Sequence, residues 1–346
     1  MSRMKKNYQV WDINIDGYHK KRNALERVQF IAGFGLLAPS SHNSQPWKFS
    51  FTNNSIEILA DMRRSLPASD QNNRQLFISL GCAAENIQVA ANYYGFRLVI
   101  EYIPQGMQIR LEEREKGNLS NDHLIFSVSE RRTNRNVYLD RMPDKAFLDL
   151  IQKFSTSEMR IDCISEKKQK DKIADVVIAA GITAMEDEGF RKELSQYVKP
   201  NITSSPKGMP CFGFGIPTPI SLFAPLMMRF LNMNKITKAQ DEKVLKEHTP
   251  SVLLISTRSD NAETWMKVGQ RYERIALEAQ RHGISAAPMA AAIQIGKFYK
   301  DLQKILNISL RPQFFCRLGY ATKVTPHSPR ISGEDVFSLM PESINS

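Results

Sequence analysis

Three clusters of polar and basic residues hold the side chains most able to do chemistry in this sequence. The first is the loop 38–47, where serines, a histidine, an asparagine and a glutamine lie between Pro39 and Pro46. The prolines stiffen the loop, and its hydroxyls and amides can offer several fixed hydrogen bonds to a ligand. The pyrimidine edge or the ribityl hydroxyls of a flavin need such bonds. A polar turn between a helix and a strand is the alternative interpretation.

The second cluster is strongly basic. Arg131, Arg132 and Arg135 bring three guanidinium groups together beside Thr133. A guanidinium group forks two N–H donors toward a phosphate, and each charge-assisted hydrogen bond contributes about 1.5 to 3 kcal/mol. The cluster therefore indicates a phosphate monoester as ligand. A solvated basic helix end is the alternative.

The third cluster lies near the end of the sequence. Arg317, Gly319 and Tyr320 belong to an expected strand, and the loop that follows contains two prolines as well as Ser328 and Arg330. Because prolines stiffen this loop too, it can return one more cation to the same phosphate.

The elements that must position these clusters include both helices and strands. Apolar spacing and capping residues predict helices at about 17–38, 70–94, 122–132, from 143 onward, 167–197, 238–248, 262–282 and 290–306. Alternating or continuous apolar runs between turn residues predict strands at 47–52, 55–60, 97–103, 107–111, 159–165, 251–257 and 313–321. Small and apolar residues predict that the helix 70–94 is buried, and 251–257 reads as a strand buried on both faces. An α+β fold with mixed sheets covered by helices follows.

The composition is that of an ordinary globular protein, with 346 residues of which 42% are hydrophobic. The four cysteines are far apart and form no CxxC pair, so neither a metal site nor a disulfide framework is expected.

The net charge of +11 comes from scattered residues without a nucleic-acid-binding motif, and we expect no nucleic-acid partner. The N-terminal residues lack the unbroken apolar core of a signal peptide, so a cytoplasmic location is expected. Dinucleotide-binding, Walker, HExxH and GxSxG motifs are missing from the sequence.

Residues 209–228 form an uncharged segment that has about the length of a membrane span. The segment contains Pro210, Pro217, Pro219 and Pro225, which argue against one spanning helix. We predict no membrane partner and an apolar flap that folds over the inside of the protein. Contact with a membrane is the alternative.

In content and in order, the clusters resemble the nitroreductase family. The loop from Pro39-Ser40-Ser41 to Pro46-Trp47 resembles the family's PSxxNxQPW flavin loop, and residues 131–135 resemble its phosphate-binding segment. The terminal pair Gly319-Tyr320 with Ser328-Pro329-Arg330 resembles its GY…R element, and 283–289 resembles the segment that approaches flavin N5. The resemblance extends over about 17–337.

This resemblance implies a nitroreductase fold, an FMN cofactor and an oxidoreductase that transfers hydride through flavin N5. The acceptor would be a small nitroaromatic, a quinone or a similar molecule, NAD(P)H is a candidate reductant, and no side chain acts as a catalytic group. The residues implied to bind FMN are Ser40, Ser41, Asn43, Gln45, Arg131, Arg132, Thr133, Arg135, Pro288, Ala290, Ala291, Ser328 and Arg330.

In ordinary family members the arginine segment comes before the PSxxNxQPW loop, and here that order is reversed. The reversed order resembles the Acg-like subgroup, in which one chain contains two nitroreductase-like halves and a lid. This implies an internally duplicated chain with halves at 17–120 and 121–340, a lid at 200–237 and one FMN per chain. Such a chain would be a monomer that mimics a dimer, or a homodimer. The family's usual Glu-Gly pair is Ala290-Ala291 here. That difference and the lid favour, as the alternative, an FMN-sequestering protein without NAD(P)H-driven turnover.

Overall fold

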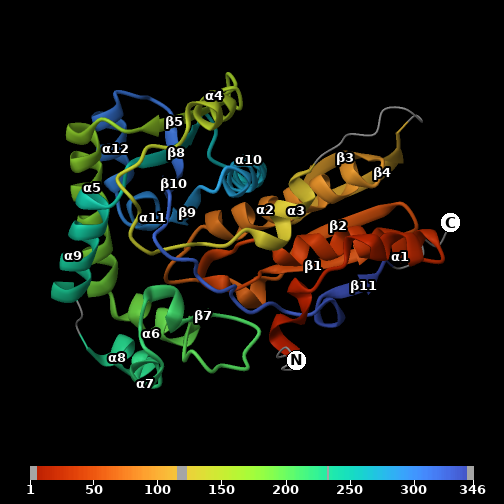
Figure 1. Cartoon of the computed structure of the whole chain (residues 1–346), viewed down its shortest axis with the longest axis horizontal. Coiled ribbons are helices and arrows are strands. Elements are labelled where there is room, and N and C mark those ends of the chain that lie inside the picture. The colour runs from red at the N-terminus through yellow and green to blue at the C-terminus, as the bar shows by residue number, and fades with distance from the viewer. Residues whose placement is uncertain (1–5, 115–122, 232–233, 341–346) are drawn as a thin grey trace.

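The structure is a computed structural model that describes residues 6–114, 123–231 and 234–340. Two β-sheets lie on either side of a group of central helices (Figure 1). The first sheet has the strand order β11-β1-β2-β4-β3, with β1 at Trp47–Phe51, β2 at Ser55–Ala60, β3 at Phe96–Ile103, β4 at Gly106–Glu113 and β11 at Phe337–Leu339. The second has the order β5-β8-β10-β9, with β5 at Met159–Ile164, β8 at Ser251–Thr257, β9 at Ser285–Pro288 and β10 at Arg311–Gly319.

The strand directions are mixed, as the sequence predicts. In the first sheet β11 is parallel to β1, whereas the other neighbours are antiparallel. The second sheet is antiparallel throughout its named strands. Because β11 lies near the end of the chain and pairs with β1, the final segment joins the sheet that the first strands begin. The α+β class is therefore confirmed.

The helices cover the sheets and fill the space between them (Figure 1). They are α1 at Ala24–Gly33, α2 at Arg74–Tyr93, α3 at Leu124–Glu130, α4 at Lys145–Gln152, α5 at Lys167–Glu186, α6 at Glu188–Tyr197, α7 at Thr218–Ser221, α8 at Ala224–Phe230, α9 at Asn234–Glu242, α10 at Ala262–Arg281, α11 at Ala291–Gln294 and α12 at Phe298–Leu306. A further short pair of parallel strands, β6 at Val198–Lys199 and β7 at Met209–Pro210, connects the two ends of a long loop.

Three long helices predicted from the sequence are interrupted. The stretch 17–38 contains α1 with a 3-10 turn before it and another after it, and α1 begins only after Asn23, whose side chain accepts a hydrogen bond from the Glu26 amide. Asp187 separates α5 from α6 and accepts a hydrogen bond from the Phe190 amide, as an N-cap does. The stretch 290–306 breaks between α11 and α12, where Gly296 has a φ of +48°. The hairpin β1–β2 and the buried strand β8 are as predicted.

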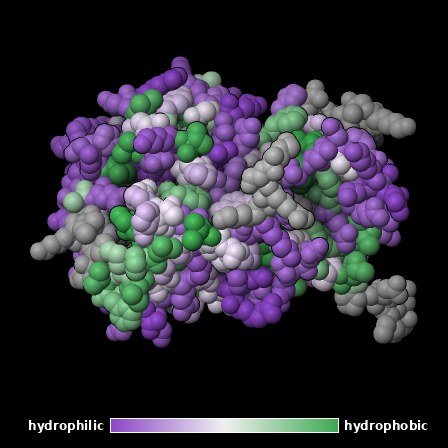
Figure 2. Space-filling model, turned by 60° about the horizontal axis from the view of Figure 1, so that its bottom comes forward, coloured by the Kyte–Doolittle hydropathy of each residue, from purple (hydrophilic) through white to green (hydrophobic). Residues whose placement is uncertain are grey.

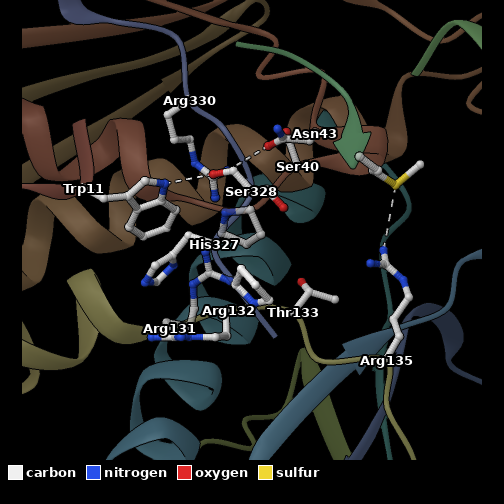
Figure 3. Close-up of a pocket in the computed structure, with 13 residues that line it drawn as sticks. Trp11, Ser40, Asn43, Arg131, Arg132, Thr133, Arg135, His327, Ser328 and Arg330 are labelled. Carbon is white, nitrogen blue, oxygen red and sulfur yellow. Dashed lines mark hydrogen bonds between the residues drawn. The ribbon is translucent and has the colours of Figure 1, made fainter. Parts of the chain in front are cut away.

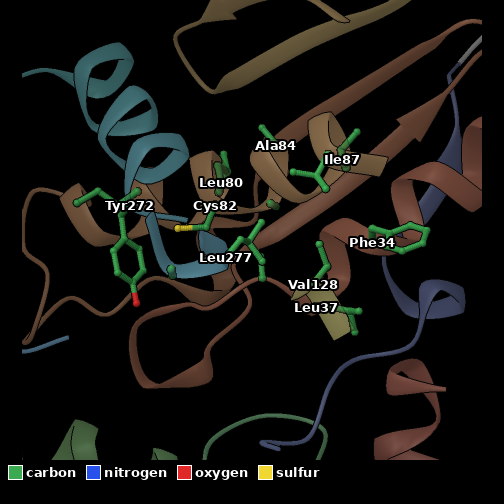
Figure 4. Close-up of a cluster of buried hydrophobic side chains, with 14 of the residues drawn as sticks. Phe34, Leu37, Leu80, Cys82, Ala84, Ile87, Val128, Tyr272 and Leu277 are labelled. Carbon is green, nitrogen blue, oxygen red and sulfur yellow. The ribbon is translucent and has the colours of Figure 1, made fainter. Parts of the chain in front are cut away.

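The centre of the molecule is the crossing of α2 and α10 (Figure 4). Most of α2 is buried, as predicted, and Asp70 caps it by accepting hydrogen bonds from the amides of Gln75 and Leu76. A Cβ atom added to Gly81 would lie 1.9 Å from the Met266 carbonyl oxygen. One added to Gly269 would lie 2.0 Å from the Ile78 carbonyl oxygen. The two helices can therefore approach this closely only because each has a glycine at the contact.

The segment 209–228 does not bury its apolar side chains as a flap over the protein interior should. It comprises β7, a short 3-10 turn, α7 and most of α8, and it extends from the body at the lower left of Figure 1. Met209, Cys211 and Ala224 are buried, but Ile220, Leu222, Phe223 and Leu226 are exposed. The expectation of a segment folded inward thus holds for only part of its residues. Of the helices that the structure describes, none combines the length and the apolar character of a membrane span.

Candidate functional site

One small cavity brings the three sequence clusters together (Figure 3). The loop after α1 forms one side, the segment after α3 forms another, and the loop after β10 closes the third. The lining residues are Trp11, Pro39, Ser40, Asn43, Arg131, Arg132, Thr133, Arg135, Met209, Pro326, His327, Ser328 and Arg330. Side chains from distant parts of the sequence therefore converge on one point.

The first loop holds a strained backbone. His42, Asn43 and Gln45 have φ values of +51°, +54° and +52°, a region that residues with a side chain rarely occupy. Each such residue costs on the order of 1 to 3 kcal/mol and persists only where its surroundings hold it. Strain of this kind is concentrated at functional sites. Here the strained backbone directs the polar side chains of one short loop toward the cavity and toward the neighbouring loops that hold it.

The surroundings that hold this loop are hydrogen bonds to the Gln45 side chain and backbone. The backbone amide of Gln45 donates to Ser40 Oγ at 2.9 Å, and its side-chain Nε2 donates to the Pro206 carbonyl oxygen at 2.7 Å. In return, Gln45 Oε1 accepts from the Ile331 amide at 2.9 Å. Gln45 is fully buried and does not line the cavity. Its side chain thus connects the first loop to the C-terminal loop and to the long loop between β6 and β7.

Two guanidinium groups meet at the floor of the cavity. Arg131 Nη2 donates to the Leu37 carbonyl oxygen at 3.0 Å, and Arg330 Nη2 donates to the same oxygen at 3.1 Å. Arg330 also donates through Nη1 to Asn43 Oδ1 at 2.9 Å. Burial and the charge of Arg131 lower the pKa of Arg330 to about 9. Two buried like charges that share one neutral acceptor favour an anion beside them.

A buried carboxylate that the sequence analysis missed faces one of these arginines. Glu273 on α10 is fully buried, and its Oε1 lies 2.8 Å from Arg131 Nε. Burial raises the pKa of Glu273, whereas the charge of Arg131 opposes that shift. The sequence did contain a signal for Glu273. It lies on the same face of its amphipathic helix as the core residues Tyr272 and Ala276, and a glutamate in such a position is rarely buried unless it is paired.

The other two arginines of the second cluster, Arg132 and Arg135, add positive charge to the lining of the cavity. Arg132 Nη1 donates to the Thr325 carbonyl oxygen at 3.3 Å. The Arg135 guanidinium carbon lies 5.0 Å from the centroid of the Phe214 ring, and the one hydrogen bond of its side chain to the described residues is a long contact of 3.9 Å from Nη2 to Met209 Sδ. No carboxylate of the described residues pairs with Arg135. Its charge is therefore available to a ligand.

Trp11 and His327 line the cavity from the opposite side. Their rings stack at 3.9 Å between centroids, and Trp11 Nε1 donates to the Ser328 carbonyl oxygen at 2.8 Å. Burial, and then the charges of Arg132, Arg131 and Arg330, lower the pKa of His327 to about 3. His327 is therefore neutral at pH 7 and adds no further charge. No pattern in the sequence pointed to Trp11, which reaches the site only through the fold.

The predicted site residues divide into two groups. Those that line the cavity are Ser40, Asn43, Arg131, Arg132, Thr133, Arg135, Ser328 and Arg330. Those that do not line it are Ser41, Gln45, Pro288, Ala290 and Ala291. The arginine segment nevertheless runs beside β9, because the Asn134 amide donates to the Ala286 carbonyl oxygen at 3.1 Å and Thr133 bridges to Ala286. Pro288 belongs to that strand, and Ala290 and Ala291 begin α11 directly after it.

The loop between β6 and β7 covers part of the cavity. The Asn43 side chain donates to the Gly208 carbonyl oxygen at 3.0 Å, and Gly208 has a φ of +91°. Met209 lines the cavity. The free space is about 50 Å³, whereas pockets for cofactor-sized ligands usually measure about 300–1,000 Å³. The donor set thus fits a phosphate group, and a larger ligand requires that this loop move outward.

Similarity to known proteins covers most of the chain. "Putative NAD(P)H nitroreductase Rv3131" of Mycobacterium tuberculosis is 20% identical over 308 residues, which cover 86% of each chain. "Putative NAD(P)H nitroreductase acg" of the same organism is 21% identical over 314 residues, or 87% of this chain and 92% of that protein. The chain is a distant homologue of these mycobacterial proteins. No family model matches it.

Solved structures of nitroreductases also match part of the chain. The FMN- and NADPH-dependent nitroreductase NfnB from Sphigopyxis sp. strain HMH has a TM-score of 0.43 at 17% identity, covering 63% of this chain and 99% of that one. Iodotyrosine deiodinase bound to FMN and 3-iodo-L-tyrosine has a TM-score of 0.38 at 15% identity, covering 60% and 95%. These scores are too low to carry an argument about the site, so the relationship of the chain to nitroreductase-like proteins rests on the mycobacterial homologues.

Proposed function

We propose that this chain is an FMN-binding oxidoreductase of nitroreductase type that reduces a small nitroaromatic, a quinone or a similar acceptor. The observation that carries the proposal is the convergence of Arg131 and Arg330 on one carbonyl oxygen, that of Leu37. Such a pair of buried cations, with Arg132 and Ser328 beside it, is suited to the dianionic phosphate of a flavin mononucleotide. The distant homology to nitroreductase-like proteins supports the same conclusion.

Each part of the site has a distinct task in this proposal. Arg131, Arg132, Ser328 and Arg330 would hold the phosphate, and the other lining groups and their supports, Ser40, Ser41, Asn43, Gln45 and Thr133, would hold the ribityl chain or the polar edge of the ring. Arg135 would place its free charge near the N1 and O2 atoms of the flavin. Bound FMN would supply the hydride-transfer chemistry, which no side chain of the site provides.

The backbone after β9 would face the reactive side of the flavin. Pro288 ends the strand that runs beside the arginine segment, and Ala290 and Ala291 open α11. The methyl groups of the two alanines provide neither a charge nor a hydrogen bond, so only their amides could contact the ring. This region would be reached once the loop around Gly208 and Met209 moves away from the arginine segment.

The proposal includes the arrangement of the whole chain. The two halves, 17–120 and 121–340, would together form one FMN site, with 200–237 as the lid. Residues 115–122, where the halves would meet, lie outside the described residues, as do 232 and 233 within the lid. One FMN per chain is expected because each sequence cluster occurs once. A monomer in the cytoplasm, or a homodimer, is compatible with this arrangement.

Anaerobic reduction tests the proposed activity. The protein is saturated with FMN, oxygen is removed, and NADH or NADPH is mixed in while the flavin absorbance is followed by stopped flow. Rapid bleaching, followed by reoxidation when a nitroaromatic or a quinone is added, is the expected result. An FMN-bound protein whose flavin neither NADH nor NADPH bleaches contradicts the oxidoreductase proposal.

A protein that sequesters FMN is the second candidate function, and one observation favours it. The side chains of Asn43 and Gln45 hold the loop between β6 and β7 against the cavity, through Gly208 and Pro206. A loop that closes over bound flavin in this way would exclude a reductant. Under this alternative FMN binds tightly, but neither nicotinamide cofactor bleaches it until Gln45→Ala frees the loop.

A further inference from the structure

The helices α7 and α8, together with residues next to them, present an exposed apolar face. Phe223 is 62% exposed, Leu226 60% and Phe230 67%, values unusual for large apolar side chains in one place. Ile220, Leu222 and Leu231 are exposed next to them in sequence, and Ile202 is exposed in the loop after β6. Figure 2 shows a hydrophobic area at its lower left, the side on which α7 and α8 lie in Figure 1. We call these seven residues the flap face.

The sequence segment that contains the flap face has charges of one sign. Between Glu193 and Asp241 the sequence contains no Asp or Glu, but it contains Lys199, Lys207, Arg229, Lys235 and Lys238. Arg229 is exposed and lies over the Phe230 ring, with 5.1 Å between the guanidinium carbon and the ring centroid. Lys207 is also exposed, and it lines a shallow pocket with Arg63, Arg64 and Asp61, the carboxylate that pairs with both arginines. An exposed apolar face is thus accompanied by cations and by no acidic residue in this segment.

We propose that the flap face docks on the surface of an anionic lipid bilayer. Aromatic and aliphatic side chains that project next to basic residues are the combination that binds the interface of such a membrane. The apolar side chains enter the boundary between head groups and acyl chains, while each nearby Lys or Arg is attracted by the negative surface potential. The helices α7 and α8 have 4 and 7 residues and so lie on the bilayer without crossing it.

A second copy of this chain fits the flap face less well. A symmetric pair would place the same surface of both copies together, and with it two sets of like charges that no acidic residue of the segment neutralises. An anionic bilayer offers the opposite charge to the same residues. The charge pattern therefore selects the membrane over self-association.

Vesicle sedimentation tests this proposal and is independent of flavin binding. The full chain is mixed with phosphatidylcholine vesicles, with or without phosphatidylglycerol, and bound protein is measured at low and high salt. The variant Phe223→Asp/Phe230→Asp is compared with Leu139→Asp/Leu339→Asp, which removes two apolar side chains exposed to 49% and 62% elsewhere and changes the net charge equally. Thermal unfolding establishes that both variants fold.

We expect the wild type to bind the anionic vesicles and to dissociate at high salt. The partition coefficient of the flap variant should fall by at least about tenfold, whereas that of the control should fall by no more than about threefold. No binding by the wild type, or an equal loss in both variants, overturns the proposal. Self-association of the wild type without vesicle binding, abolished by the flap variant, would show that the flap face binds a second copy and would overturn it as well.

Discussion

Arg131 and Arg330 donate hydrogen bonds to the same acceptor, the carbonyl oxygen of Leu37. One arginine follows α3 and the other lies in the C-terminal loop, so the fold itself forces two buried cations together. Among the described residues, Arg131 pairs with the buried carboxylate of Glu273, whereas Arg330 has no carboxylate in an ion pair. An unbalanced positive charge therefore remains next to Asn43 and Ser328, and an anion with several oxygens is the ligand that would balance it.

Removing either arginine should weaken FMN binding. For Arg131→Ala or Arg330→Ala we expect the Kd for FMN to rise by about 10- to 150-fold, the equivalent of one charge-assisted hydrogen bond of about 1.5 to 3 kcal/mol. Quenching of flavin fluorescence measures it. The control is Arg160→Ala, which removes an exposed arginine that pairs with Asp162 far from the cavity. FMN affinity equal to that of the wild type in both site variants would show that the phosphate lies elsewhere.

Neutralising Glu273 should have opposite effects on stability and on binding. Burial raises the pKa of Glu273 to about 7, so above that pH it is ionised and compensates the buried charge of Arg131. At pH 8 we therefore expect Glu273→Gln to lower the free energy of unfolding by about 3 kcal/mol in the absence of FMN. Since a carboxylate beside the phosphate position repels the ligand, the same variant should bind FMN more tightly. Denaturant unfolding with and without FMN measures both effects. Weaker FMN binding by the variant would mean that Glu273 holds Arg131 in its binding position.

The crossing of α2 and α10 should not tolerate a methyl group at Gly81. A Cβ atom there would lie 1.9 Å from the Met266 carbonyl oxygen, so the helices must separate. We expect Gly81→Ala to destabilise the protein by about 3 kcal/mol or more, as overpacking of a core does. The matched control is Gly181→Ala within α5, where the added Cβ meets only Asp241 Oδ2 at 4.0 Å. That variant should be stabilised by about 0.5–1 kcal/mol, and equal effects of the two substitutions would refute the packing explanation.

The stability of the protein should fall as the pH decreases from about 6.5 toward 4. Burial, and then the charge of Arg135, lower the pKa of His42 to about 4, so the folded state keeps this ring neutral. The unfolded chain takes up a proton near pH 6.5, binds more protons than the folded state below that pH and is favoured there. His42→Asn should flatten the dependence by up to about 1.4 kcal/mol per pH unit, because asparagine tolerates the φ of +51° and does not titrate. Denaturant unfolding at several pH values measures the slope, and an unchanged slope would contradict this account.

The parts of the fold that follow local rules could be predicted from the sequence. The hairpin β1–β2, the buried strand β8 and the helix α2 each have a pattern within their own residues. The breaks at Asp187 and Gly296 were missed because apolar spacing continues across them, although both residues are common at helix ends.

The sequence clusters contain most of the residues that line the candidate cavity. Trp11 could not be predicted, because its contact with His327 depends on how the N-terminal segment packs against the C-terminal loop. Glu273 was missed because the residue that pairs with it, Arg131, is far away in sequence, and only the fold brings the two side chains together. The exposed face of α7 and α8 was missed because apolar composition alone does not distinguish a buried segment from a docking surface.

The most direct test of the central claim is a titration of the purified wild-type chain with FMN, followed by flavin fluorescence and by the absorbance spectrum of the protein after gel filtration. We predict saturable binding of one FMN per chain and flavin absorbance that stays with the protein. A folded protein that gains no flavin absorbance, even at high FMN concentration, would contradict the claim that these arginines form a flavin-phosphate site.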